Sequence, residues 1–277
     1  MYIPTKSQNL KEIDFVQIRL GLLGESGTGK TFSALTFPNP VVADFDGGLV
    51  AHQGRDIIAI PFHEHDWVKD APRGKITHPN GGPNRRDAFL EWLKTEAVKL
   101  EKDQTLVLDS WTTLQDAFDA QTDLEPAVSN DGKIDSYVFW ERKIDFSKQV
   151  MTSLKGLKCH VVVTFHESKV RDPKTGQLMD KIAPLMQGKF VASLMLHFTD
   201  FFRCHAKDKI KLDGNKKPVL DELTGKQVVE DTIFLWQCKS DSSVNCKTRM
   251  HDAPMFLEPH FNSLKYNKTE PVLTVVK

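Results

Sequence analysis

Eight consecutive residues near the start of the chain have the types and the spacing that hold phosphate. They are Gly24, Glu25, Ser26, Gly27, Thr28, Gly29, Lys30 and Thr31, which match the pattern G-x-x-x-x-G-K-[ST]. Glycine permits positive φ and close approach, so successive backbone N–H groups can point at one phosphate. Lys30 can reach the β- and γ-phosphates of a nucleotide, and the Thr31 hydroxyl can bind Mg²⁺. We expect a nucleotide site here; the alternative is an ordinary glycine-rich turn.

Carboxylates follow two other apolar stretches. Residues 105–108 are followed by Asp109, and residues 41–43 are followed by Asp44 and Asp46. Ligands of open parallel sheets gather at the carboxyl ends of the strands, so Asp109 is expected to hold Mg²⁺; a helix N-cap is its alternative. Asp44 and Asp46 alternate and would lie on one side of an extended chain. One of them could orient an attacking water, or both could be turn residues.

Short apolar runs and longer helical patterns alternate along the first part of the chain, and these elements must position the residues above. Strands are predicted over residues 16–23, 41–45, 57–60, 105–108 and 159–165, and helices over residues 31–37, 88–100, 114–124 and 137–157. This alternation implies an α/β fold, with a mostly parallel sheet and helices on both faces. The phosphate-binding pattern lies between the first strand and the first helix, as it requires.

The C-terminal third has a different pattern. Short strands are predicted over residues 201–205, 219–220 and 233–238, with turns at residues 213–215 and 224–225. They indicate antiparallel hairpins at the edge of the sheet. Residues 69–86 and 167–189 are predicted to be surface loops. Nothing in the sequence reads as a linker, so residues 1–277 are predicted to form one domain.

Composition bounds the possible functions. Lys+Arg and Asp+Glu are both 37, so the formal net charge is zero, and any nucleic-acid contact must come from a local patch. The apolar runs are far shorter than the roughly 20 residues of a membrane helix. The four cysteines have neither the spacing of a disulfide framework nor that of a zinc site. With a polar N-terminus that does not resemble a signal peptide, we expect a cytoplasmic protein.

Four motifs in a fixed order carry a family resemblance. They read GESGTGKT, VVADFDGG, TLVLDS and VVVTFHE. This order resembles the RecA-like P-loop ATPase core, and more narrowly it is similar to phage RecA-like ATPases grouped with single-strand-annealing recombination proteins. The resemblance covers residues 15–262. It implies a RecA-like P-loop NTPase fold, ATP and Mg²⁺ as cofactors, and ATP hydrolysis.

The resemblance also implies roles for single residues. Asp46 stands where the family usually has a glutamate that activates water; aspartate is one methylene shorter, so slow hydrolysis is expected. His166 stands where RecA-type proteins place a polar residue that senses the γ-phosphate, and a histidine that merely ends a strand is its alternative. Lys247 and Arg249 resemble paired cations that reach the ATP of a neighbouring subunit. Lys247 and Arg249 alternate on a predicted strand, so both can project to one side. The alternative interpretation is that they are two solvated cations.

The same resemblance points to single-stranded DNA. Residues 167–189 correspond to a loop that contacts DNA in RecA proteins, and its candidate contacts are Lys169, Arg171, Lys174 and Lys181. The companion loop at residues 126–136 is acidic here, which departs from a DNA role. Residues 203–217 are also rich in lysine, as either a solvated face or a second surface that follows phosphates.

The expected function is therefore an ATPase that acts on single-stranded DNA in phage recombination. The implied partners are single-stranded DNA, further copies of the chain in a ring or filament with ATP at subunit junctions, and a single-strand-binding protein. If the chain is phage-encoded, its compartment is the bacterial host cytoplasm. The alternatives are an ATPase of the same core that drives helicase loading or packaging, a small-molecule phosphotransferase, and an interaction module without turnover.

Overall fold

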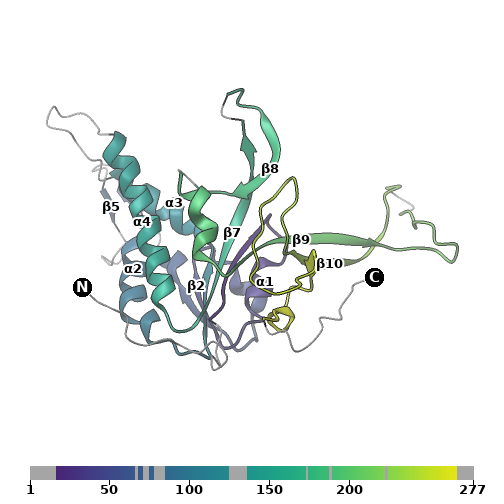
Figure 1. The fold of residues 1–277 in the computed structure, drawn as a ribbon, viewed down its shortest axis with the longest axis horizontal. Coiled ribbons are helices and arrows are strands. Elements are labelled where there is room, and N and C mark those ends of the chain that lie inside the picture. The colour runs from purple at the N-terminus through teal and green to yellow at the C-terminus, as the bar shows by residue number, and fades with distance from the viewer. Residues whose placement is uncertain are drawn as a thin grey trace.

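The computed structural model describes residues 17–65, 68–70, 75–77, 85–124, 136–172, 174–186, 189–221 and 224–266. A nine-stranded mixed sheet lies at its centre (Figure 1). Across the sheet the strands are β11 (Phe256–Leu257), β10 (Val229–Gln237), β9 (Asp200–Ile210), β1 (Arg19–Gly24), β7 (His160–Arg171), β6 (Thr105–Asp109), β2 (Pro40–Asp44) and β3 (Ile58–Pro61). A further strand, β8 (Leu178–Pro184), pairs with the outer part of β7.

The pairing is parallel from β9 to β3 and antiparallel at β10, β11 and β8. The helices are α1 (Lys30–Ala34), α2 (Arg85–Thr95), α3 (Trp111–Leu124) and α4 (Ser136–Gly156). Short 3₁₀ helices are η2 (Gly48–His52), η3 (Phe62–His65), η4 (Ala97–Lys99), η5 (Lys189–His197) and η6 (Phe261–Ser263). Two short strands, β4 (Val68–Asp70) and β5 (Lys75–Thr77), form a separate antiparallel pair. No described helix has the length and apolarity needed to cross a membrane.

Both faces of the sheet are covered. One apolar cluster joins the sheet to α2, α3, α4 and η5, and a second joins it to α1 and the chain near residues 250–266. Within β6, Leu106 and Leu108 belong to the first cluster and Val107 to the second. Since side chains alternate between two buried faces, the central strands need apolar residues at every position, which explains their continuous apolar runs.

These observations confirm the predicted α/β class, with a mostly parallel sheet, helices on both faces and antiparallel strands near the C-terminus. The first helix is shorter than the predicted 31–37. After Ala34 the chain tightens, because the amides of Thr36 and Phe37 donate to carbonyls only three residues back. Pro38 follows and has no N–H to continue a helix. The predicted strand at residues 219–220 is reduced to one isolated bridge between Leu220 and Gln227.

The prediction of a surface loop at residues 167–189 is wrong for most of its length. Strand β7 continues to Arg171, turns, and returns as β8, with Glu167 opposite Pro184. The turn is closed by the amide of Gly176, which donates to the carbonyl of Asp172, and Gly176 has φ +71°. A glycine at positive φ after an aspartate is typical of a tight hairpin turn, so local chemistry explains the hairpin.

The prediction of a surface loop at residues 69–86 is also wrong where the structure describes these residues. The end of β4 and the whole of β5 lie within this range, and α2 begins at Arg85. The other residues of this range, and nearly all of the companion loop at residues 126–136, lie outside the described residues. Figure 1 shows two hairpins that leave the body of the molecule: β7–β8, and the longer arm that begins with β9 and β10.

Candidate functional site

The phosphate-binding pattern forms the connection between β1 and α1, and its glycines are required by the backbone. Gly27 and Gly29 both have φ +79°, a conformation that other residues rarely adopt. A Cβ at Gly24 would lie 2.5 Å from the Thr28 hydroxyl, and a Cβ at Gly29 would lie 3.0 Å from the Phe234 ring. A Cβ at Gly27 would meet nothing within 4 Å, so this part of the loop borders open space.

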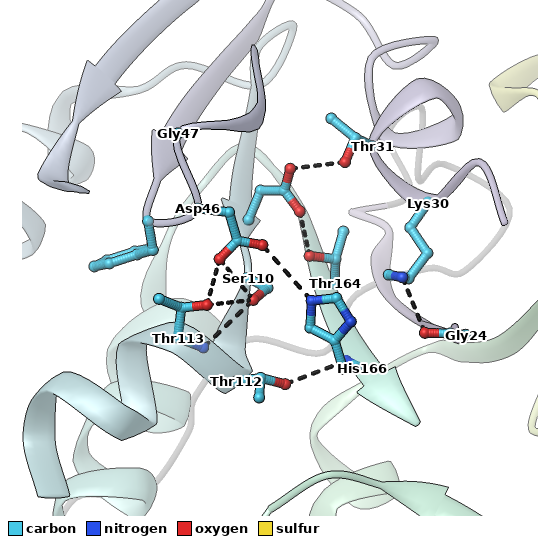
Figure 2. A network of polar contacts seen from close by, with 12 residues as sticks. Gly24, Lys30, Thr31, Asp46, Gly47, Ser110, Thr112, Thr113, Thr164 and His166 are labelled. Carbon is cyan, nitrogen blue, oxygen red and sulfur yellow. Dashed lines mark hydrogen bonds and ion pairs between the residues drawn. The ribbon is translucent and has the colours of Figure 1, made fainter. Parts of the chain in front are cut away.

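Lys30 is folded back onto this loop. Its Nζ donates to the carbonyl of Gly24 at 2.9 Å (Figure 2). It also donates to the carbonyl of Glu25 at 2.7 Å, and the residue is 7% exposed. Burial lowers the pKa of Lys30, while nearby Cys204 and Asp109 act in the opposite direction. The loop therefore already holds a cation beside the amides that would surround a phosphate.

Asp109 lies at the carboxyl end of β6, and both of its carboxylate oxygens are bound by hydroxyl groups. Thr31 donates to Oδ2 at 2.8 Å, and Thr164 of β7 donates to Oδ1 at 2.5 Å. Asp109 precedes α3 but does not cap it. That role falls to Ser110, whose Oγ accepts from the amide of Thr113 at 3.4 Å. The carboxylate of Asp109 is thus directed at the phosphate-binding loop.

The donor chemistry of this corner fits Mg²⁺. Burial raises the pKa of Asp109; hydrogen bonds from Thr164 and Thr31 lower it, and the neighbouring carboxylates of Asp46 and Asp44 raise it again. A bound cation would relieve this crowding of negative charge. The described residues hold no group of three or more His, Cys, Asp or Glu that could bind a metal. A magnesium ion held by Thr31 and Asp109 would therefore complete its coordination with phosphate oxygens and water, as Mg²⁺ commonly does.

Asp46 is the centre of a second polar network. Its Oδ1 accepts from the hydroxyls of Ser110, at 3.1 Å, and of Thr113, and its Oδ2 lies 3.7 Å from Nε2 of His166 (Figure 2). Burial alone would raise the pKa of Asp46, but the contact with His166 and the hydrogen bonds from Thr113 and Ser110 outweigh it, and the net pKa is lowered. The side chain therefore stays ionised, with one oxygen saturated and the other directed at His166.

The neighbouring carboxylate of Asp44 has another role. Its Oδ1 accepts from the amides of Asp46 at 3.1 Å and of Gly47 at 2.8 Å, and Gly47 has φ +69°. Its Oδ2 lies 3.4 Å from Nδ1 of His63, a residue that the sequence analysis did not single out. Of the two aspartates that spacing could not separate, Asp44 shapes the turn and Asp46 faces the other functional groups.

His166 connects this network to the rest of β7. It pairs in register with Gly24, where β1 turns into the phosphate-binding loop. Its amide donates to the Thr112 hydroxyl at 3.2 Å, and its carbonyl accepts from the amide of Leu185 at 2.7 Å. The imidazole therefore stands beside Asp46 at the point where β7 leaves the sheet to form the β7–β8 hairpin.

The candidate DNA contacts all lie on this hairpin. They are Lys169, Arg171, Lys174 and Lys181, and all four are exposed. None of them forms an ion pair with a described residue. Arg171 donates to the carbonyl of Gly176 at 3.2 Å, and Asp172 accepts from the amides of Lys174 and Thr175, which fixes the turn. The hairpin therefore presents cations without an ion-pair partner among the described residues, although Asp172 and Asp180 lie on the same hairpin.

Lys247 and Arg249 are not on a strand, which corrects the prediction; the chain forms only a single bridge there, between Lys247 and Phe201. Nζ of Lys247 donates to the carbonyls of Met195 at 2.9 Å and Phe198 at 2.6 Å, whereas Arg249 is exposed. Burial and the charge of Arg249 lower the pKa of Arg19 at the start of β1, and burial, Arg249 and Arg19 lower the pKa of Lys247. Lys247 and Arg249 thus lie toward the end of β1 opposite its phosphate-binding loop.

Sequence analysis missed the hydroxyl groups of the site, which are Ser110, Thr112, Thr113 and Thr164. Three of them follow Asp109 directly in the run DSWTT, and the fourth lies two residues before His166. The clustering of hydroxyl residues near the carboxyl ends of buried strands could have indicated these residues, because those ends meet at one edge of the sheet.

Comparison with known proteins shows a family, and the solved structures that resemble this chain include two with low sequence identity. The AAA domain family matches residues 17–228. The crystal structure of the RadB recombinase is 13% identical, with a TM-score of 0.32 over 79% of this chain and 87% of that chain. The flagellar accessory protein FlaH from Methanocaldococcus jannaschii is 12% identical, with a TM-score of 0.32 over 82% and 79% of the respective chains. A comparison with curated proteins finds no match.

Proposed function

Because the chain belongs to the AAA domain family, we propose that it is a Mg²⁺-dependent ATPase that acts on single-stranded DNA, in phage recombination by single-strand annealing. The proposal has two parts, a nucleotide site and a DNA surface, which are supported by different residues.

The nucleotide part follows from the chemistry of the loop between β1 and α1. Backbone amides of residues 24–31 bind the phosphates, and Lys30 exchanges its loop carbonyls for the β- and γ-phosphate oxygens. Thr31 and Asp109 would hold Mg²⁺, which supplies charge neutralisation at the phosphates when bound. The supporting observation is the 2.8 Å hydrogen bond that already joins these two side chains.

The base for hydrolysis is Asp46. Two hydroxyl groups fix its Oδ1, so Oδ2 is the atom that can orient a water and accept its proton. His166 lies on the Oδ2 side and is in register with the first glycine of the loop. It can therefore exchange its contact with Asp46 for one with a γ-phosphate, and its position would report whether that phosphate is present.

The DNA part rests on one observation, the continuity of β7. The same strand carries His166 beside Asp46 and then, within five residues, Lys169 and Arg171 on an exposed hairpin. Unpaired cations on such a hairpin neutralise phosphates and release counterions, which gives affinity without sequence preference. A single strand bound there would act on the segment that senses the nucleotide.

Assembly is the remaining element of the proposal. Arg249 and Lys247 lie away from the phosphate-binding loop of their own chain, so they could act on ATP only in a neighbouring copy. Such an arrangement places ATP at subunit junctions of a ring or filament. A further proposed partner is a single-strand-binding protein, because it would bind the same DNA.

The deciding experiment measures ATP hydrolysis with and without single-stranded DNA, together with DNA binding and annealing of complementary oligonucleotides. We expect hydrolysis to depend on Mg²⁺ and to rise with single-stranded DNA more than with duplex. Turnover that is indifferent to DNA, with no DNA binding in any nucleotide state, would contradict the DNA part. Transfer of the γ-phosphate to a small acceptor would instead favour a phosphotransferase.

A further inference from the structure

A part-buried ion pair joins the two strands on either side of β1. Arg203 of β9 donates to Glu167 of β7 through two parallel hydrogen bonds, Nε to Oε2 and Nη2 to Oε1, both at 2.9 Å. The side chains of Glu167 and Arg203 are 6% and 19% exposed. By contrast, the pair formed by Lys209 and Glu230 on the outer arm is 54% and 51% exposed. Geometry and burial therefore set the inner pair apart from a surface contact.

The sheet topology explains why this pair forms. Strand β1 lies between β7 and β9, with Gly24 opposite His166 and Leu23 opposite Arg203. After Gly24 the chain leaves the sheet to form the phosphate-binding loop, while β7 continues to Glu167. The two long side chains meet across the gap that β1 vacates.

The pair is electrostatically close to the loop itself. Burial lowers the pKa of Lys30, and Glu167 is one of the neighbouring groups that oppose this shift. The hydrogen bond to Glu167 is the main reason that the pKa of Arg203 is raised, and Glu25 of the loop adds to it. Cys204, the next residue of β9, places its carbonyl oxygen 3.1 Å from the position of a Cβ on Gly24. The strand that carries Arg203 therefore packs against the first residue of the loop.

On its other side the pair holds the base of the β7–β8 hairpin. Glu167 directly follows His166 and pairs with Pro184 of β8. The ion pair thus links β9, which packs against the phosphate-binding loop, to Glu167, the residue next to His166. Since a shift of about 1 Å in a positioned group can cost on the order of 10²-fold in rate, this link matters for hydrolysis.

We propose that Glu167 and Arg203 are positioning residues for ATP hydrolysis, which fix His166 and the base of the β7–β8 hairpin relative to the phosphate-binding loop. They act through His166 rather than by contact with the reacting atoms. The proposal rests on the hydrolysis proposed above. The positioning role goes beyond that function. The lysine-rich pattern of residues 203–217 predicted that Arg203 is solvated or follows phosphates, and it did not predict an ion pair within the sheet.

The test replaces both partners at once. Removing one partner leaves a buried charge without compensation and destabilises the fold, whereas replacing a buried pair by apolar side chains of similar size is often neutral. We therefore choose the double variant Glu167→Met/Arg203→Met. Its matched control is Lys209→Met/Glu230→Met, which removes an ion pair from the exposed part of the arm.

We expect the inner double variant to melt within a few degrees of wild type and to bind nucleotide with an affinity within about twofold, while kcat falls on the order of tenfold or more with KM nearly unchanged. The outer control should keep its kcat. Wild-type kcat in a folded inner variant would overturn the proposal, and so would a change confined to KM. If the inner variant does not fold, Arg203→Lys decides the matter, since it keeps the charge but loses the fork; full kcat in that variant would also overturn the proposal.

A second readout separates this proposal from the proposed function. The imidazole resonance of His166, assigned by its loss in His166→Gln, is followed while Mg²⁺ and a non-hydrolysable ATP analogue are added. We expect a nucleotide-dependent shift in wild type that is reduced in the inner double variant and kept in the outer control. An identical shift in all three proteins would overturn the positioning role. Absence of hydrolysis in wild type, with the shift intact and sensitive to the ion pair, would instead count against the ATPase.

Discussion

After the carboxyl ends of β1, β2 and β6, Lys30, Asp44 and Asp109 are buried and hydrogen-bonded within the site, whereas the cations of the β7–β8 hairpin lie exposed. Lys30, Asp44 and Asp109 are 7%, 3% and 5% exposed, and each has hydrogen-bond partners within the site. Lys169 and Lys181 lie on the hairpin in open solvent. Strand β7 runs from one region into the other.

The difference predicts two kinds of response to substitution. A buried charge has specific partners, so its removal leaves them uncompensated and has a large effect that salt changes little. Exposed charges act through their number, so each removal has a small effect that salt screens. The variants below test this contrast, beginning with the site.

Lys30→Ala should have the largest effect. It removes the one positive side chain that the phosphate-binding loop already holds, and with it the stabilisation of the β- and γ-phosphates. We expect nucleotide binding or turnover to be abolished at both low and high salt, as measured by calorimetry and phosphate release. Lys94→Ala, on the exposed side of α2, is the control. Normal affinity and hydrolysis in Lys30→Ala would contradict the nucleotide site.

Arg249→Ala tests whether a cation far from its own loop acts on a neighbouring copy. We leave Lys247 in place because its ammonium binds two backbone carbonyls and supports the fold. A cation supplied across a junction is worth on the order of 10³-fold or more in kcat, so hydrolysis should fall while nucleotide binding persists.

Mixing Arg249→Ala with Lys30→Ala sharpens the test. About a quarter of the junctions in an equal, random mixture pair an intact loop with an intact Arg249, so part of the activity should return. No recovery in mixtures that sedimentation shows to be assembled would contradict a shared site.

Asp46→Asn should retain nucleotide binding and lose roughly 10²- to 10⁴-fold in hydrolysis, the usual contribution of a general base. The amide can still accept from Ser110 and Thr113, so the network around Oδ1 is preserved. Single-turnover hydrolysis measures the effect, with Asp103→Asn on an exposed turn as the control. Normal hydrolysis would mean that another group, such as Asp44, orients the water.

The sheet and most of its elements could be predicted because buried parallel strands consist largely of consecutive apolar residues, as in residues 105–108 and 161–163. The phosphate-binding loop could be predicted because its glycines serve a backbone geometry, seen in the positive φ of Gly27 and Gly29. Neither inference needs to know what lies across the sheet.

The roles of Asp44 and Asp46 could not be separated in this way. Both lie after the same strand, and the difference arises from partners distant in sequence, Ser110, Thr113 and His166. Lys247 shows the same limit, because its pattern fits a strand but its ammonium binds carbonyls about fifty residues earlier. Long-range partners set these roles, and a single sequence does not reveal which residues they are.

The lysine-rich stretch at residues 203–217 illustrates how a local count misleads. The whole arm, residues 205–231, carries six lysines at 207, 209, 211, 216, 217 and 226 and six acids at 208, 213, 221, 222, 230 and 231. Lys209 pairs with Glu230 at 3.0 Å, and Arg203 pairs with Glu167 inside the sheet. Strand pairing brings the acids of β10 beside the lysines of β9, so the arm is the natural control for the hairpin.

Removing Lys169, Arg171 and Lys174 together should weaken binding of single-stranded DNA and flatten the slope of log K against log salt by up to about 2 units, at roughly 0.7 for each phosphate that is no longer neutralised. The weakening should be similar for all sequences. Fluorescence anisotropy across a salt series measures it. The matched control on the arm replaces Lys207, Lys209 and Lys211 by Ala. We expect a smaller change in DNA affinity and in the salt slope for this variant. Equal effects, or a larger effect on the arm, would move the DNA surface to β9–β10.

Asp109→Asn should give the smallest effect on the isolated protein, and in the stabilising direction. The folded state raises the pKa of Asp109, first through burial, so the folded protein holds this proton more readily than the unfolded chain. Stability from this group is therefore full at acid pH and is lost as pH rises through the folded pKa. With Mg²⁺ removed by a chelator, the variant should melt higher than wild type at neutral pH, by about 2–4 °C for each kcal/mol, and the gap should shrink in acid. Adding Mg²⁺ with a non-hydrolysable ATP analogue should reverse the order, because only wild type offers the carboxylate beside Thr31. A variant that melts lower than wild type at every pH would show that the hydrogen bonds from Thr31 and Thr164 to the carboxylate outweigh the cost of its burial.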